Sequence, residues 1–97
     1  MTQQSAGDDD YATNMVGLVT DIARALVDSP ESVSVEAIME GDGTVLRLRV
    51  APSDIGKVIG KQGRTARSLR TILAAASMKL RHRFSLDIVE QEESPQA

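Results

Sequence analysis

The chain lacks cysteine and tryptophan, and it contains only one histidine, one tyrosine and one phenylalanine among its 97 residues. Without cysteine there is no disulfide, no thiolate nucleophile and no cysteine-ligated zinc site. The lone histidine, His82, likewise excludes a site built from several histidines. With Tyr11 and Phe84 as its only aromatic rings, the chain has no platform on which several bases could stack. We therefore expect no metal and no other cofactor.

Long apolar runs are absent as well. The longest stretch without a charged residue, Tyr11 to Thr20, has ten residues and includes several polar ones, whereas a membrane-spanning helix needs about 20 apolar residues. The first ten residues are polar and end in three aspartates, so they are unlike a secretory signal peptide. A content of 41% apolar and 26% charged residues is typical of a small soluble domain, and we expect it in the cytoplasm.

Acidic residues are scarce in one part of the chain. The segment from Arg47 to Arg83 holds ten of the eleven basic residues and a single acid, Asp54, which gives a formal charge of +9. The remainder holds thirteen acids against one basic residue, Arg24, which gives −12. Such segregation indicates either a face that meets a polyanion or a solvated helix face that neutralises acids elsewhere in the fold. The charges alone favour neither interpretation.

The spacing of apolar residues predicts one domain over residues 11–90 between two polar, disordered tails, residues 1–10 and 91–97. Helical spacing and two-residue alternation follow one another along this domain. They predict a helix over 12–27, strands over 33–40 and 45–50 joined by a glycine turn, a short helix over 54–59 with Ser53 as its N-cap, a long helix from about Arg64, and a strand over 84–89. The order α-β-β-α-α-β favours an α+β fold with helices packed on one face of a small three-stranded sheet.

The predicted elements have faces of different character. In the first strand, alternation puts four apolar residues on one face: Val33, Val35, Ala37 and Met39. On a wheel of the long helix, the apolar side consists of Leu69, Ile72, Leu73, Ala76 and Leu80, and the basic side of Arg64, Arg67, Arg70 and Arg81. We expect the apolar side in the core and the basic side as an exposed stripe, with His82 as a surface residue late in this helix.

The segment with the most chemical content is VIGKQGRT, Val58 to Thr65, between the two predicted helices. Gly60 and Gly63 allow a tight turn and close access for a ligand, because they carry no β-carbon. Gly60 also suits the end of the short helix in a left-handed conformation. The main-chain N–H groups at the start of the next helix carry partial positive charge, which suits a phosphate. With Lys61 inside it, the loop is interpreted as a clamp on a sugar-phosphate backbone.

Two other phosphate-binding motifs do not fit this segment. A P-loop needs a second glycine five positions after its first, but Lys61 stands five positions after Gly56, and Thr65 five after Gly60. A dinucleotide-binding fingerprint fails because Val58 stands where its first glycine belongs.

The run VIGKQG, followed by a basic amphipathic helix, resembles the (I/V)-I-G-x-x-G signature of the KH domain. In that RNA-binding module a GXXG loop clamps the backbone of four nucleotides. The resemblance covers roughly Met15 to Val89, and the order of elements is similar to the type II arrangement. The longer run SDIGKVIGKQGRTARSLRTIL is similar to the KhpA family of small bacterial proteins with a single KH domain.

This resemblance implies a non-enzymatic protein that binds single-stranded RNA and acts post-transcriptionally. The residues that it implies are Gly60, Lys61, Gln62 and Gly63 as the clamp loop, Ile55, Val58 and Ile59 as a wall of the groove for the bases, and Lys57, Arg64, Arg67 and Arg70 as further RNA contacts. Leu46, Leu48 and Val50 could form the opposite wall, although a plain core position is the stronger interpretation for them. The resemblance also implies a homodimer, and pairing with a larger KH protein of the KhpB or Jag type.

Two other classes of function compete with this interpretation. A protein-interaction adaptor on the same fold, with incidental RNA contact, is the alternative, and the net charge of −3 and the scarcity of aromatic residues favour it slightly. An enzyme is rejected because Asp54 is the only acid near the loop, and because Arg81 and Arg83 flank His82. No nucleophile with a base and an orienting group can be proposed.

Overall fold

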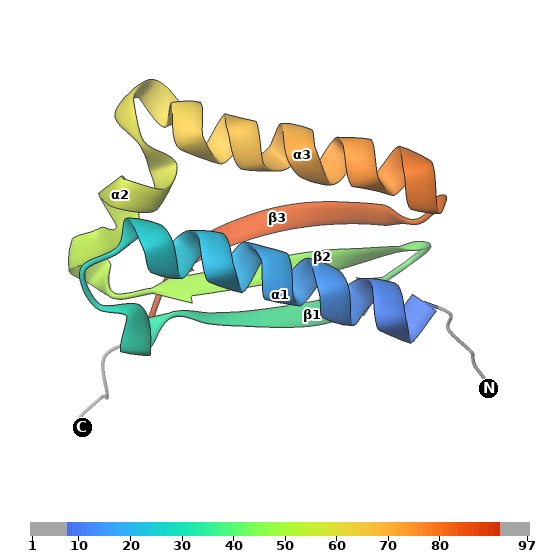
Figure 1. The fold of residues 1–97 in the computed structure, drawn as a ribbon, viewed down its shortest axis with the longest axis horizontal. Coiled ribbons are helices and arrows are strands. Elements are labelled where there is room, and N and C mark those ends of the chain that lie inside the picture. Colours follow the sequence, from blue (N-terminus) through green and yellow to red (C-terminus); the bar gives the residue numbers. More distant parts are fainter. Residues whose placement is uncertain (1–7, 92–97) are drawn as a thin grey trace.

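A computed structural model describes residues 8–91 of the chain (Figure 1). Its elements in chain order are α1 (Asp8–Leu26), β1 (Ser34–Glu40), β2 (Gly43–Val50), α2 (Ile55–Ile59), α3 (Arg64–Leu80) and β3 (Arg83–Glu90). Short 3₁₀ turns precede β1, α2 and α3. The predicted α+β fold and the predicted order of elements are confirmed. The predicted disorder of residues 1–7 and 92–97 concerns parts of the chain outside the described residues.

The sheet has the strand order β1-β2-β3. β1 and β2 form the predicted antiparallel hairpin, from the pair Ser34 and Arg49 to the pair Glu40 and Gly43 at the turn. β3 pairs with β2 in parallel, with Leu46 opposite Leu86. Parallel neighbours need a crossover connection, and here the crossover consists of α2 and α3. As a result α3 lies along β3, while α1 lies over β1 and β2 (Figure 1).

The core lies between the helices and one face of the sheet. Its centre is the row of alternating residues in β2, Leu46, Leu48 and Val50, none of which has any exposed surface. Val19 and Ala23 of α1 and Leu69 and Leu73 of α3 complete the same apolar cluster. Full burial of one such large apolar side chain contributes about 1.5–3 kcal/mol. The opposite face of the sheet carries charged residues, among them Arg47 and Asp87, whose side chains are 3.1 Å apart.

Three residues predicted for the buried faces are exposed, and one of them is Ala37 in the edge strand β1. Ile72 of α3 is 46% exposed, because the apolar side of this helix is wider than the surface that β3 offers to it. Met39 of β1 is 66% exposed, because it lies beside the hairpin turn at the end of an edge strand. Periodicity shows which residues share a face, but only the packing decides how far along the element that face is covered.

The ends of several elements also differ from the prediction. α1 begins at Asp8, so residues 8–10 belong to this helix and not to the predicted N-terminal tail. At the other end, the amide of Gln91 donates to the carbonyl of Val50 at 2.6 Å, which makes Gln91 part of the fold. Ser53 is not an N-cap, because it lies inside a 3₁₀ turn and makes no capping hydrogen bond.

The long helix is shorter than predicted at its C-terminal end. It ends at Leu80, and Arg81 adopts the left-handed conformation with φ = 58°. His82 therefore lies in the connection to β3 and is half-buried. Its Nε2 lies 2.7 Å from the Thr44 hydroxyl, and its ring centre lies 4.9 Å from that of Phe84. These contacts give His82 a structural role, joining the α3–β3 connection to β2. Within residues 8–91, no helix is long and apolar enough to cross a lipid bilayer.

Candidate functional site

The loop between α2 and α3 requires glycine at its first position. Gly60 has φ = 79° and ψ = 171°, a combination that is almost confined to glycine. A β-carbon on Gly60 would clash with the hydroxyl of Thr65 and would lie only 2.7 Å from the Thr65 β-carbon and 2.9 Å from its backbone nitrogen. The predicted positive φ is confirmed, although ψ lies outside the left-handed helical region. The loop can therefore close onto α3 only because residue 60 has no side chain.

The rest of the loop is open to solvent. Gln62 adopts a left-handed conformation with φ = 57°, and Gly63 has φ = 73°. The amide of Gly63 donates to the carbonyl of Gly60 at 3.1 Å and closes the turn. Lys61 and Gln62 are both exposed, and a β-carbon on Gly63 would meet no atom within 4 Å. The space beside Gly63 is thus open to a ligand.

The start of α3 adds an electrostatic component. Gly63 occupies the N-cap position and makes no side-chain capping bond, so no side chain satisfies the N–H groups of the first turn from this position. α3 has 17 residues, and its dipole favours an anion at this end. The start of α3 therefore has the electrostatic character that suits a phosphate, and the phosphate contact itself stays a prediction.

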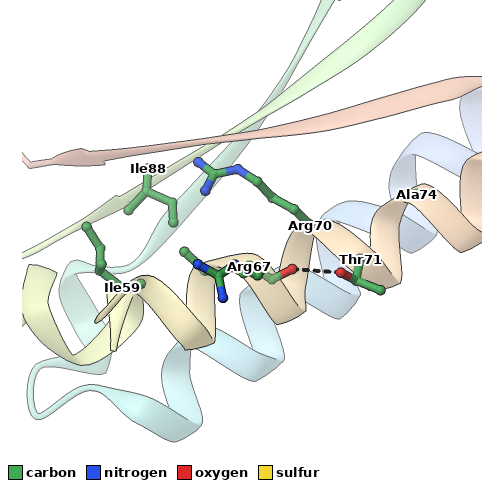
Figure 2. A pocket seen from close by; sticks show the side chains of 8 residues that line it. Ile59, Arg67, Arg70, Thr71, Ala74 and Ile88 are labelled. Atoms are coloured by element: carbon green, nitrogen blue, oxygen red, sulfur yellow. Dashed lines mark hydrogen bonds between the residues drawn. The ribbon is translucent and has the colours of Figure 1, made fainter. Parts of the chain in front are cut away.

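An open groove of about 620 Å³ begins beside this loop (Figure 2). It is lined by Ile59, Gly63, Ala66, Arg67, Arg70, Thr71, Ala74 and Ile88. Figure 2 shows Ile59 and Ile88 at one end of the groove, and the Arg70 side chain reaching from α3 toward β3. The lining is aliphatic with two guanidinium groups, and no acidic side chain of the described residues contributes to it. Such a groove suits a ligand with flat apolar parts and negative charge.

The structure brings four of the predicted site residues together in the groove: Ile59, Gly63, Arg67 and Arg70. Gly60, Lys61 and Gln62 form the adjoining loop, and Arg64 is exposed in the first turn of α3 without lining the groove.

The other predicted site residues lie elsewhere. Val58 has no exposed surface, so its predicted place in the groove wall is wrong, because α2 turns this side chain into the core. Ile55 is half-buried against that core and does not line the groove. The ammonium of Lys57 lies 3.4 Å from Asp28 and 3.6 Å from Asp54, so it is paired with acids away from the groove. Leu46, Leu48 and Val50 are core residues only.

The residue that provides the opposite wall of the groove was not predicted. Ile88 provides it, from the end of β3, and it belongs to the alternating apolar residues that predict this strand. Which strand would lie beside α3 depends on the sheet order, and the alternation carries no information about that. Ala66, Thr71 and Ala74 were not predicted either. Thr71 and Ala74 lie on the same side of the helical wheel as Arg67, so their positions on the wheel could have predicted that they line the same groove.

A buried carboxylate holds α2 in place. Asp54 is 1% exposed, and its two oxygens accept hydrogen bonds from the amides of Asp28 at 3.2 Å and Ser29 at 3.0 Å. Burial by itself raises the pKa of Asp54, but the two amide bonds and the nearby Lys57 outweigh it, and the pKa is held below its usual value. Asp54 therefore stays ionised and ties the end of α1 to the start of α2. We regard it as a positioning residue for the loop.

Comparison with known proteins identifies the family. The family model described as the KH domain of KhpA/KhpB matches residues 17–88. The chain belongs to this family. The protein named RNA-binding protein KhpA in Halalkalibacterium halodurans is 49% identical over 76 residues, covering 78% of this chain and all of that protein. The protein of the same name in Aquifex aeolicus is 54% identical over 69 residues, covering 70% of this chain and 86% of that protein.

Solved structures agree with this fold. Era from Aquifex aeolicus, solved with GDP and aluminium fluoride, aligns with a TM-score of 0.53 at 18% identity, over 79% of this KhpA/KhpB-family chain. A second structure, Era in complex with a segment of 16S ribosomal RNA, aligns with the same TM-score of 0.53 at 17% identity. The chain spans only 30% and 29% of these two Era chains. At such low identity the likeness concerns the fold alone.

The two loop glycines should differ in their tolerance of alanine. Gly60→Ala should lower the free energy of unfolding by at least about 1–3 kcal/mol, because it combines a backbone conformation nearly confined to glycine with the clash at Thr65. Gly63→Ala should cost only about 1 kcal/mol, because its positive φ is strained while the space beside it is empty. Urea unfolding followed by circular dichroism measures both. Equal destabilisation would contradict the role assigned to the Gly60–Thr65 contact.

The Asp54 carboxylate should make stability depend on pH in the acid range. Because its pKa is lowered on folding, its contribution is present above the ordinary value of 3.8 and is lost as the pH falls through the lower folded pKa. Asp54→Asn should therefore be less stable than the wild type at pH 7, and this difference should shrink below about pH 4. Urea midpoints between pH 7 and pH 2.5 test this. Asp42→Asn, at an exposed turn, is the control and should follow the wild type; a difference for Asp54→Asn that is constant with pH would refute the assignment.

Proposed function

We propose that this KhpA/KhpB-family chain is a non-enzymatic protein that holds single-stranded RNA, about four nucleotides at a time, between its glycine loop and β3. The observation that carries this proposal is the open backbone at Gly63 beside a groove that contains Arg67 and Arg70 and, among its described lining residues, no acid. The relatives named RNA-binding protein KhpA support it. Because the partner would be cellular RNA, we expect the protein to act in the cytoplasm.

The phosphates would lie on the loop. Lys61 and Gln62 are exposed there, and the first N–H groups of α3 point toward the same space. Arg67, one turn into α3, lines the groove and would meet the next phosphate along the strand. These contacts orient the strand without reading its sequence.

The bases would turn into the groove against Ile59, Ala66 and Ile88. β3 is an edge strand, and Arg70 donates to the outward carbonyl of Leu86 at 3.3 Å. Alternation along the strand directs the N–H and carbonyl of Ile88 to the same outer edge, where they can bond to the edge of a base. Since no aromatic ring of the described residues lines the groove, recognition would depend on these hydrogen bonds and on aliphatic contact. We therefore expect modest affinity and a loose sequence preference.

The proposal is tested by reversing the charge of the loop. Lys61→Asp/Gln62→Asp leaves both glycines and the core intact, and aspartate tolerates the left-handed conformation of residue 62. Binding of labelled single-stranded RNA should fall at least about tenfold. The slope of log K against log salt should drop by about 0.7 for each phosphate that the variant no longer binds.

The matched control is Arg24→Asp/Ala25→Asp, which changes two exposed residues of α1 and the net charge by the same amount. It should retain RNA binding within about threefold, because long-range charge effects between exposed groups are screened by salt. If both variants bind RNA equally weakly, the attraction is diffuse and the groove is not the site. If the loop variant binds RNA like the wild type, the adaptor function becomes the better proposal.

We further propose that the protein acts as a homodimer or together with a larger KhpB-like KH protein. One groove of modest affinity gains strength when a second groove binds the same RNA, because the second binding step becomes intramolecular. The described helices leave Leu18 and Ile72 38% and 46% exposed, which offers apolar surface for such a contact. Sedimentation equilibrium over a range of concentrations should show a species of twice 10.4 kDa. A monomer at all concentrations would contradict the homodimer.

A further inference from the structure

The space between α3 and β3 extends beyond the groove. Beyond Arg70 it opens into a second hollow of about 250 Å³, lined by Arg70, Leu73, Phe84, Ser85 and Leu86. Arg70 lines both spaces. Because its guanidinium donates to the carbonyl of Leu86, this side chain bridges from α3 to β3 and forms the boundary between the groove and the second hollow.

The two spaces lie in line. The groove involves the start of α3 and Ile88 near the end of β3, whereas the second hollow involves the middle of α3 and Phe84 near the start of β3. Figure 1 shows α3 running beside β3 over its whole length, with the glycine loop at one end. A strand that leaves the groove along α3 therefore meets the second hollow next.

The chemistry of the second hollow also suits RNA. Leu73, Phe84 and Leu86, which are 2%, 4% and 6% exposed, form an apolar floor, and Arg70 supplies a planar cation, a group on which bases stack. None of the described residues that line it is acidic.

Some outward backbone groups of β3 beside the second hollow already have hydrogen-bond partners within the protein. The Ser77 hydroxyl accepts a hydrogen bond from the amide of Phe84 at 2.8 Å, and the guanidinium of Arg70 donates one to the carbonyl of Leu86. A base in the second hollow would thus find fewer free backbone groups than a base beside Ile88. Arg81, which is exposed in the connection at the end of α3, can meet a phosphate there.

We propose that a single RNA strand continues past Arg70, and that the second hollow receives at least one further nucleotide by stacking and shape, with little preference for its base. This inference rests on the proposed function and extends the binding footprint beyond four nucleotides. The groove would carry the sequence preference and the second hollow would add affinity for any base.

The test is a length series with the full chain. Unlabelled oligouridines of four, five, six and eight nucleotides compete with a labelled RNA, and fluorescence anisotropy gives each affinity. Affinity should rise about fivefold or more between four and six nucleotides, as one additional stacked base provides, and should then level off. A rise of no more than about threefold, which the additional binding registers of a four-nucleotide site on a longer strand produce alone, would overturn the inference while leaving the proposed function intact. No binding at any length would overturn both.

A matched pair of variants tests the location. Arg70→Lys keeps the positive charge but removes the planar guanidinium of the second hollow, and Arg67→Lys makes the same change at a residue that lines only the groove. In Arg70→Lys the ratio of the affinities for six and four nucleotides should fall to the roughly threefold that binding registers alone produce. Arg67→Lys should keep a ratio of about fivefold or more. If Arg70→Lys, folded by circular dichroism, keeps that ratio as well, the additional nucleotide does not stack in the second hollow.

Discussion

Parallel pairing of β3 with β2 is the constraint on which the rest of the structure depends. Antiparallel strands can be joined by a short turn, but parallel strands need a connection that returns along the length of the sheet. Here α3 makes that return and runs beside β3, while α2 and the glycine loop occupy the end where the chain reverses. The groove is the space that remains between the returning helix and the free edge of β3. Fold and site thus follow from the same pairing.

Two local contacts hold the loop at the end of this crossover. Gly60 lies so close to Thr65 that no side chain fits between them, which sets the angle between α2 and α3. Asp54 accepts hydrogen bonds from the backbone amides of Asp28 and Ser29, which follow α1, and thereby fixes the start of α2. The first contact requires that residue 60 has no side chain, and the second depends on the buried carboxylate of Asp54. Together they place the loop relative to both long helices, so that the loop adjoins the groove.

Physical features of the groove agree with the family to which the chain belongs. A cation at Arg67, an exposed loop backbone and an aliphatic lining suit a polyanion with flat bases. The same features explain why the acidic net charge of −3 is compatible with RNA binding: thirteen acids lie outside the basic segment, and none of those described lines the groove. The local charge at the site, and not the charge of the whole chain, decides what approaches it.

Much of the fold and the loop could be predicted because the relevant signals are local. The order of elements follows from periodicities of 3.6 and two residues, and Gly60 and Gly63 follow from the need for positive φ in a tight turn. The faces of α3 were predicted in the same way, and Leu69 and Leu73 are indeed buried. The predicted positions of Ile72 and Met39 were wrong because they depend on how much of a face the neighbouring elements cover, and that of His82 was wrong because α3 ends at Leu80.

By itself the sequence determined the α+β order, the glycine loop and the basic helix that follows it, since each is a property of residues close together in the chain. Tertiary structure alone decided which of the predicted contacts share one surface. It turned Val58 into the core, paired Lys57 with Asp28, and brought Ile88 opposite Ile59 as the second wall. The last of these outcomes depends on the pairing of two strands that the whole crossover separates in the chain. No local pattern encodes which edge of the sheet the returning helix will follow.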